Sequence, residues 1–245
     1  MSLIVASLAE RPDVVERLPF GPGWPQFIFH DPVAARLMPT VDRVFADVNL
    51  VLLDDEDAVV AGGWGVPLTW DGSVEGLPGG WDGALERAVA EHESAVVPDT
   101  FCAMATEVTA SHRGTGLSRQ VLSALRQRAE AHELARMIAP ARPTLKHRYP
   151  LTPIERYAVW TRDDGAPFDP WLRTHTRVGA TVLAPERKGM VIQGSVGEWE
   201  EWTGLAFPDS GEYVVPDALA PITVDRDRDI GRYVEPAVWM LHGER

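Results

Sequence analysis

The spacing of apolar positions along the chain predicts amphipathic helices interleaved with short strands. From residue 117 onward, apolar side chains recur at Val121, Leu122, Leu125 and Ala129. This is the i, i+4, i+8 stripe of a helix that packs one face on a core. Short apolar runs bounded by turn residues precede and follow this segment, and they are typical of strands. The pattern therefore predicts a mixed α/β fold.

The same criteria place the other elements. Further helices are predicted at residues 12–18, 32–45, 82–93 and 170–178. Strands are predicted at residues 3–8, 48–53, 58–66, 100–109, 137–139, 180–183, 190–195, 199–205 and 231–241. Pro39 is expected to break or kink its helix, because proline removes a backbone donor. The acidic turn at residues 54–57 is expected to close a hairpin. Residues 140–170 are rich in proline and are predicted to form a long irregular excursion.

The length of 245 residues allows a sizeable hydrophobic core. The chain shows no internal repeat, no low-complexity tract and no clean linker. The simplest organisation is one domain over residues 1–245, with a core at about residues 48–183 and an elaborated C-terminal third.

Charge and cysteine content exclude several classes of protein. Asp and Glu outnumber Lys and Arg by 36 to 23, for a formal charge of −13, so a nucleic-acid partner is not expected. No apolar run approaches the ~20 residues that span a bilayer, and the N-terminus does not resemble a signal peptide. The single cysteine, Cys102, fits a reducing cytoplasm. An acidic surface would steer a cationic substrate, but plain solubility is the more common reason for such a charge.

A glycine-rich turn at residues 113–116, Arg-Gly-Thr-Gly, joins the strand predicted at 100–109 to the helix that begins at 117. Gly114 and Gly116 can adopt positive φ and let a ligand approach the backbone. Amides at a helix N-terminus favour an anionic phosphate group. Neither common phosphate loop fits the spacing, because no lysine follows Gly116 and position 119 is Arg119 rather than glycine.

The turn resembles the pyrophosphate loop of the GNAT superfamily of acyl-CoA-dependent N-acetyltransferases, whose signature is Arg/Gln-x-x-Gly-x-Gly/Ala. Ser118 stands where the last small residue is usual. The resemblance implies a mostly antiparallel sheet flanked by helices, with acetyl-CoA as the acyl donor in a cleft between two splayed strands. It assigns to acetyl-CoA the residues Val108, Arg113, Gly114, Thr115, Gly116, Leu117 and Ser118.

The resemblance also suggests two catalytic side chains. The family often has a Tyr four residues before a Gly-Phe pair, and that Tyr protonates the leaving thiolate. Here His175 takes the tyrosine position before Gly179-Ala180, and a histidine holds or yields a proton near neutral pH. Glu107 is the candidate base on the motif strand. For both residues a structural role is the alternative: His175 packing in its helix, and Glu107 paired with a nearby arginine.

The implied function is transfer of an acetyl group from acetyl-CoA to a primary amine of a small molecule, by direct attack on the thioester. The alternative is a non-catalytic acyl-CoA-binding or sensing protein of the same fold. No metal spacing is present, and a homodimer stays open. Two groups have competing interpretations. The basic stretch 146–149, with Arg142 upstream, contacts the phosphates of CoA or an anionic substrate group, or is a solvated loop. The tryptophans form a cation pocket or belong to the core. The tryptophans concerned are Trp160, Trp171, Trp199 and Trp202.

Overall fold

The computed structural model describes residues 3–17, 21 and 23–243. Its strands are β1 (Ile4–Ser7), β2 (Leu50–Leu53), β3 (Val59–Leu68), β4 (Thr100–Val108), β5 (Arg136–Ala141), β6 (Ala180–Gly194), β7 (Gly211–Tyr213), β8 (Ile222–Asp225) and β9 (Ile230–His242). Its α-helices are α1 (Pro32–Val44), α2 (Gly80–Glu93), α3 (Leu117–Ala131), α4 (Ile154–Tyr157), α5 (Pro170–Arg177) and α6 (Val196–Thr203). Short 3-10 turns lie at Pro12–Arg17, Gln26–His30, Ala110–His112 and Lys146–Arg148.

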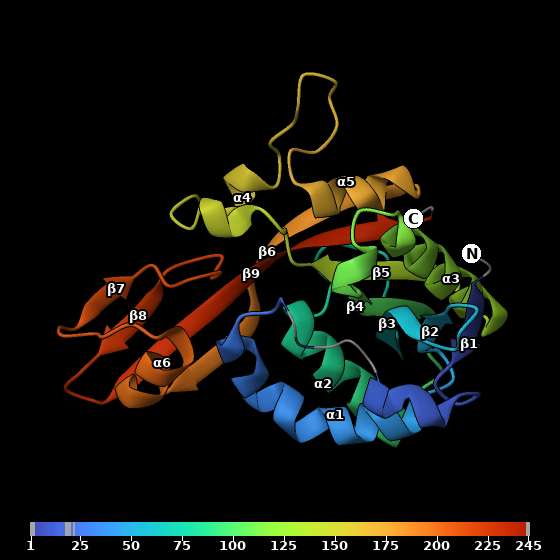
Figure 1. The fold of residues 1–245 in the computed structure, drawn as a ribbon, viewed down its shortest axis with the longest axis horizontal. Coiled ribbons are helices and arrows are strands. Elements are labelled where there is room, and N and C mark those ends of the chain that lie inside the picture. The colour runs from blue at the N-terminus through green and yellow to red at the C-terminus, as the bar shows by residue number, and fades with distance from the viewer. Residues whose placement is uncertain (1–2, 18–20, 22, 244–245) are drawn as a thin grey trace.

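A single nine-stranded sheet runs through the molecule in the order β1-β2-β3-β4-β5-β9-β8-β7, with β6 paired to β9 (Figure 1). Every strand pair is antiparallel except β4 with β5. The predicted fold class, an α/β protein with a mostly antiparallel sheet flanked by helices, is confirmed. The hairpin expected around residues 54–57 is also confirmed as β2–β3.

Helices cover both faces of the sheet. Adjacent residues of β3 point to opposite faces, so Gly63 and Trp64 show which helix packs on each face. At Gly63, an added Cβ would lie 2.5 Å from Val121 of α3, so α3 packs directly on this glycine. On the other face, the ring of Trp64 meets Trp81 of α2 edge-on at 5.6 Å. The apolar stripe predicted for α3 is buried in full. The sheet core therefore lies between α3 on one side and α1 with α2 on the other.

Helix α1 begins where the sequence indicates. The carboxylate of Asp31 accepts a hydrogen bond from the Ala34 amide at 2.7 Å, and Pro32 follows at the first helical position. The predicted break at Pro39 is wrong, because the helix continues to Val44. Pro39 lies on the exposed side, where the carbonyl that its missing N–H leaves unpaired can bind water.

Strands β4 and β5 pair only at their beginnings, from Thr100–Cys102 alongside residues 136–138. Beyond Cys102 the two strands separate, while β5 stays paired with β9 as far as Ala141. The register of β4 against β3 also shifts between Trp64 and Gly65, so β4 carries an irregularity at the point of separation. The sheet therefore opens a wedge between β4 and β5.

The long excursion at residues 140–170 is more ordered than predicted. It contains α4, and its aromatic side chains pack around Tyr157 and Trp160 in edge-on and tilted contacts. The buried carboxylate of Asp169 accepts hydrogen bonds from the amides of Thr144 and Leu145 and from the Tyr157 hydroxyl. The same carboxylate caps α5, so one side chain fixes the excursion to the start of that helix.

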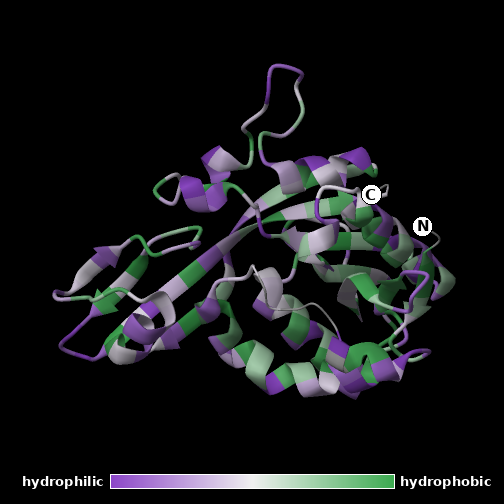
Figure 2. Ribbon diagram, viewed as in Figure 1, coloured by the Kyte–Doolittle hydropathy of each residue, from purple (hydrophilic) through white to green (hydrophobic). Residues whose placement is uncertain are grey.

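The C-terminal third forms a lobe on the long β6–β9 ribbon, seen at the left of Figure 1. Hydrophobic and hydrophilic bands alternate along this ribbon in Figure 2. The lobe has its own core around Trp199, Phe207 and Tyr233. The strand predicted at residues 199–205 is wrong, because this segment belongs largely to α6, which starts at a Ser195–Glu198 capping box. The strands predicted at 180–183 and 190–195 are parts of one strand, β6.

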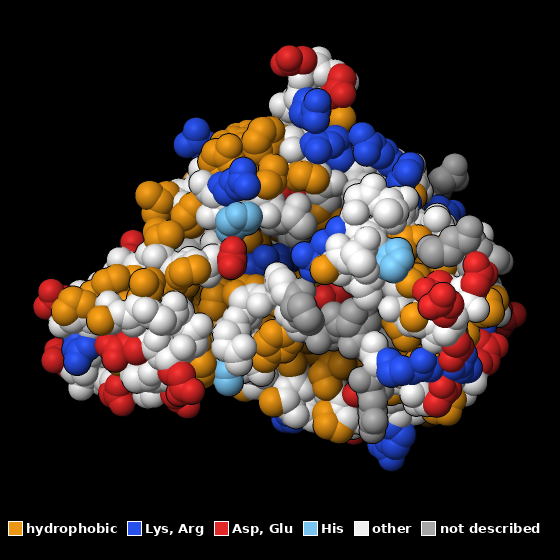
Figure 3. Space-filling view, in the orientation of Figure 1, with side chains coloured by type: hydrophobic (Ala, Val, Ile, Leu, Met, Phe, Trp, Pro, Cys, Tyr) orange, Lys and Arg blue, Asp and Glu red, His pale blue; other side chains and the backbone are white. Residues whose placement is uncertain are grey.

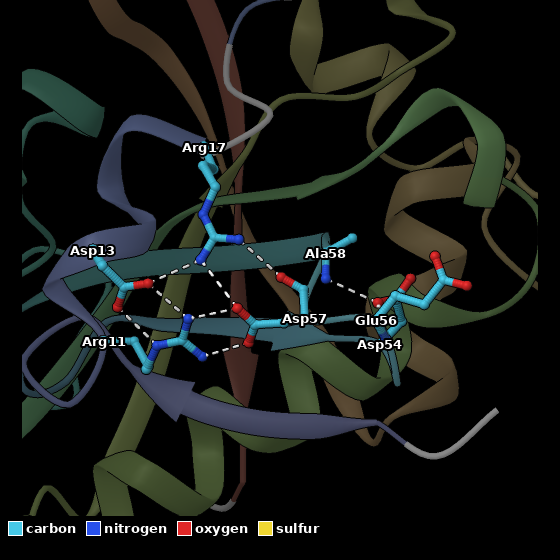
Figure 4. Close-up of polar contacts among 7 residues, drawn as sticks. All are labelled: Arg11, Asp13, Arg17, Asp54, Glu56, Asp57 and Ala58. Carbon is cyan, nitrogen blue, oxygen red and sulfur yellow. Dashed lines mark hydrogen bonds and ion pairs between the residues drawn. The ribbon is translucent and has the colours of Figure 1, made fainter.

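At the other end of the sheet, ion pairs attach the Pro12–Arg17 turn to the β2–β3 hairpin (Figure 4). The Arg11 guanidinium contacts the carboxylates of Asp13 and Asp57, each at 2.7 Å. These contacts lower the pKa of Asp13 to about 2. Asp54 closes the turn by accepting hydrogen bonds from the Glu56 and Ala58 amides, each at 2.9 Å. Among the described residues, no helix combines the length and apolar character needed to cross a membrane.

Candidate active site

The wedge between β4 and β5 opens into a cavity of about 1350 Å³. Residues 103–108 of β4 and 139–141 of β5 line its two sides, together with residues from α1, α5 and the C-terminal lobe. Figure 3 shows this face hollowed between the α4–α5 side and the α1–α2 side, with acidic, basic and histidine side chains gathered at the hollow. The cavity thus forms where the sheet loses its strand pairing.

The glycine-rich turn forms one end of this cavity. Arg113, Gly114 and Ser118 line it. Gly114 has φ +80°, and an added Cβ there would meet nothing within 4 Å. Gly116 has φ +91° and directly precedes α3. Both glycines therefore use the backbone freedom that the sequence indicated.

The remaining residues of the turn occupy different environments. Leu117 is buried and anchors α3 in the core, and Val108 lines the cavity from β4. The amide of Thr115 was expected to be available to a phosphate. In the structure it donates to the His112 carbonyl at 3.4 Å, and the Thr115 hydroxyl donates to the same oxygen at 2.6 Å. Thr115 thus closes the turn, which leaves the amides of residues 116–118 at the helix start.

Glu107 lines the cavity and is only 6% exposed. Its Oε2 atom has no hydrogen-bond partner among the described residues. Burial raises the pKa of this carboxyl, while a hydrogen bond from the Trp24 side chain and the nearby charge of Arg113 oppose the rise. Glu107 is therefore a carboxyl with a spare oxygen in the cavity wall, not a side chain fully occupied by a salt bridge.

His175 also lines the cavity and is 1% exposed. Its Nδ1 lies 2.8 Å from Nε2 of His242 on β9, and Trp171 packs edge-on against its ring at 4.4 Å. Nε2 of His175 has no partner among the described residues. Burial, reinforced by His242, lowers its pKa well below the usual value, so the ring is neutral at pH 7.

The C-terminal lobe contributes a second part of the cavity wall, here called the lobe end. Arg142 donates from Nε to Glu235 at 2.9 Å and from Nη2 to the Asp217 carbonyl at 2.7 Å. The Tyr233 hydroxyl donates to the second oxygen of Glu235 at 3.0 Å. The Arg142 guanidinium also lies over the ring of Trp24, 5.7 Å from its centre. This end therefore combines carboxylates, a held arginine and an aromatic face.

Sequence reasoning located part of this site. It named Arg142 but missed Trp24, Glu235 and His242, since only tertiary contacts bring these distant positions together. Lys146 belongs to the basic stretch that was expected to contact a phosphate or to be solvated, and it does neither. Its side chain is buried, and its ammonium donates hydrogen bonds to the carbonyls of Tyr149 and Leu219 at 2.8 and 2.6 Å.

Of the four tryptophans considered for a cation pocket, one lines the cavity and three pack in the core. Trp171 lines the cavity. Trp160 packs among Tyr149, Tyr157 and Phe168, and Trp199 with Trp202 belongs to the core of the lobe. The core interpretation is therefore correct for three of them.

Comparison with known proteins gives the class. Arginine N-acetyltransferase avaD from Aspergillus versicolor is 31% identical over 267 residues, spanning 96% of this chain and 91% of that protein. The loading GNATL domain of CurA from Lyngbya majuscula aligns with a TM-score of 0.53 at 12% identity, covering 99% of this chain and 98% of that domain. A Drosophila melanogaster polyamine N-acetyltransferase aligns with a TM-score of 0.48 at 13% identity, covering 99% and 100% of the two chains. No protein-family model matches the sequence.

The chain belongs to the GNAT superfamily of acyl-CoA-dependent N-acetyltransferases. It is an enzyme that transfers an acetyl group from acetyl-CoA to an amine of a small molecule. This assignment replaces the alternative of a non-catalytic acyl-CoA-binding protein.

Proposed function

We propose that the cavity binds acetyl-CoA at the glycine-rich turn and an arginine-like cationic amine at the lobe end. The observation that carries this proposal is the continuous cavity itself, which joins Arg113 and Gly114 to Glu107, His175 and Glu235 through the β4–β5 wedge. The two substrates then meet along β4, where the strand edge is unpaired.

The donor end suits a diphosphate. The amides of residues 116–118 at the start of α3 and the charge of Arg113 favour an anion there. The open space beside Gly114 gives the phosphates room against the backbone. The unpaired edge of β4 near Val108 offers backbone groups to the pantetheine arm, which would lie alongside as an added strand.

Glu107 is proposed as the general base. Its unpaired Oε2 can accept a proton from the substrate ammonium, and the raised pKa brings the carboxyl closer to neutral pH, where a base works best. The freed amine then attacks the thioester carbonyl, and the tetrahedral intermediate expels the thiolate.

His175 is proposed as the general acid. A neutral imidazole with its proton on Nε2 can donate that proton to the departing thiolate, and Nε2 of His175 has no other partner among the described residues. The tautomer is set by the hydrogen bond on the other nitrogen. In the proposed tautomer, Nδ1 of His175 accepts from Nε2 of His242, which leaves the proton of His175 on Nε2.

The acceptor is proposed to carry a second polar group besides its amine. The relative from Aspergillus versicolor is named for arginine. In this chain, Asp42, Glu107 and Glu235 line the cavity and can attract a cation, while Trp24 and Trp171 offer aromatic faces. We place the reaction in the cytoplasm, which suits the single, buried cysteine.

Acetyl-CoA binding tests the donor site. We expect Gly114→Trp to weaken acetyl-CoA binding at least about tenfold, or about 1.4 kcal/mol, because the indole fills the space beside the backbone. Gly165→Trp is the matched control: Gly165 also has positive φ and open space around its Cβ position, but it does not line the cavity. Calorimetric titration measures both variants. Equal affinities in the two, or no binding by the unmodified protein, would contradict the proposal.

A further inference from the structure

The pair His175–His242 lies between two separate hollows. His175 lines the active-site cavity, whereas His242 lines a smaller hollow of about 260 Å³. This second hollow is walled by α3 residues and by Val178 after α5, and the α3 residues are Leu122, Ser123, Arg126, Gln127 and Glu130. A single hydrogen bond of 2.8 Å between the two imidazoles connects the hollows.

We propose that His242 is a proton-relay residue that reloads His175 from the solvent in the second hollow. The inference rests on the proposed role of His175 as the acid that protonates the leaving thiolate. The proposal specifies the path of the proton. The proton for the thiolate enters from the α3 side of the sheet and not through the substrate-filled cavity.

The proton transfers balance when they occur in one concerted step, so that neither buried ring becomes charged. The thiolate takes the proton from Nε2 of His175 as the carbon–sulfur bond breaks. In the same concerted step, Nδ1 of His175 takes the proton from Nε2 of His242, and Nδ1 of His242 takes one from water in the second hollow, which leaves hydroxide there. Each ring begins and ends with one proton, so only the tautomers change. The reverse shift resets the tautomers: Nε2 of His175 takes a proton that the substrate ammonium has released in the active-site cavity, Nε2 of His242 takes the proton from Nδ1 of His175, and Nδ1 of His242 gives its proton to the hydroxide in the second hollow.

The surroundings of the pair favour such a neutral relay. Burial lowers the pKa of both rings, that of His242 to about 4 with a further contribution from Arg126. A charged imidazolium is therefore disfavoured in the pair, whereas a neutral ring can donate at one nitrogen and accept at the other. A purely structural histidine pair would not need one ring in each of two hollows.

The test is His242→Ala with added imidazole. The substitution opens space next to the second hollow, which free imidazole can enter from solvent. We expect kcat to fall about 10²-fold, the scale of a lost proton transfer, while acetyl-CoA affinity and the KM of the amine stay unchanged. Millimolar imidazole should restore kcat with saturation. His242→Gln should be equally slow without rescue, since an amide fills the site and holds the hydrogen bond without relaying a proton.

Controls separate the relay from the proposed function. His92→Ala, on the last turn of α2 and outside both hollows, should keep the kcat of the unmodified enzyme with or without imidazole. If the unmodified protein acetylates no cationic amine, the proposed function fails. If it is active but His242→Ala and His242→Gln retain full kcat, or imidazole restores nothing to folded His242→Ala, the relay alone is overturned. Circular dichroism establishes that each variant is folded.

Discussion

Two residues of the candidate site, Glu107 and His175, are almost fully buried. Each has one polar side-chain atom without a hydrogen-bond partner among the described residues. Leaving such an atom unpaired in a protein interior costs about 1–3 kcal/mol. Both atoms belong to side chains that line the active-site cavity. A substrate that bound there could give each atom the partner that the described residues do not supply.

The raised pKa of Glu107 predicts that replacing this residue affects activity and stability differently. Because its folded-state pKa is raised, the folded protein holds the proton to higher pH than the unfolded chain. The free energy of unfolding therefore falls as pH rises from about 4.5, the ordinary value, through the folded-state pKa. Glu107→Gln removes this loss and should not lower the Tm at pH 7, while kcat should fall about 10²-fold or more.

Thermal denaturation and steady-state rates on the same preparation measure both effects. Glu212→Gln, on the exposed strand β7, is the control for a lost carboxylate and should change neither. A Glu107→Gln enzyme with unchanged kcat would show that the carboxyl is structural.

At the scale of elements, α1, α2 and β6 meet at two carboxyls, of which Asp31 is fully buried and Asp82 is half-buried. Asp31 caps α1, and Asp82 in the first turn of α2 accepts a hydrogen bond from the Val191 amide of β6 at 2.9 Å. One oxygen of each carboxyl is otherwise unpaired among the described side chains. Burial and the adjacent Asp31 raise the pKa of Asp82 to about 8, so the two share a proton at neutral pH.

This contact predicts a loss of stability at alkaline pH. The folded state keeps a proton on Asp82 that the unfolded chain releases near pH 3.8, so the free energy of unfolding falls as pH rises toward about 8. Asp82→Asn keeps an acceptor for Val191 and gives Asp31 a permanent donor. We expect its Tm to vary less between pH 6 and pH 9 than that of the unmodified protein, whereas Asp227→Asn should follow the unmodified curve. Parallel curves for Asp82→Asn would contradict the shared proton.

The elements also show what sequence could predict. Periodicity identified α3, and the Asp31-Pro32 start located α1, because local spacing determines both. The sequence pattern predicts a strand at 199–205. The pair Ser195 and Glu198, however, has the spacing of a capping box and indicates that a helix begins there. Strands β7 and β8 are short and depend on tertiary pairing, β7 with β8 and β8 with β9, so no local signal predicts them. The His175–His242 contact joins residues 67 positions apart and requires the assembled sheet.

At the scale of the whole molecule, the two ends of the cavity come from different parts of the fold. The turn before α3 provides the proposed donor end, and the lobe on β6–β9 provides Glu235, Met190 and Asp217 at the other end. Tyr233 links the lobe core to the cavity, because its hydroxyl accepts from the Leu219 amide at 2.8 Å and donates to Glu235. Damage to the lobe core should therefore affect the two substrates unequally.

Trp199→Ala tests this division. Trp199 is fully buried in the lobe core and packs on Phe27 and Tyr233, so its removal should cost about 3–5 kcal/mol of local stability. Because Tyr233 then loses its support, we expect the KM of the amine to rise several-fold, whereas the Kd of acetyl-CoA should stay close to that of the unmodified protein. Val214→Ala, half exposed on the same lobe, is the control and should alter neither constant. If Trp199→Ala weakens acetyl-CoA binding as much as it raises the KM, both substrates depend on the lobe and the division is wrong. Calorimetry for the donor and initial rates for the amine distinguish the two results.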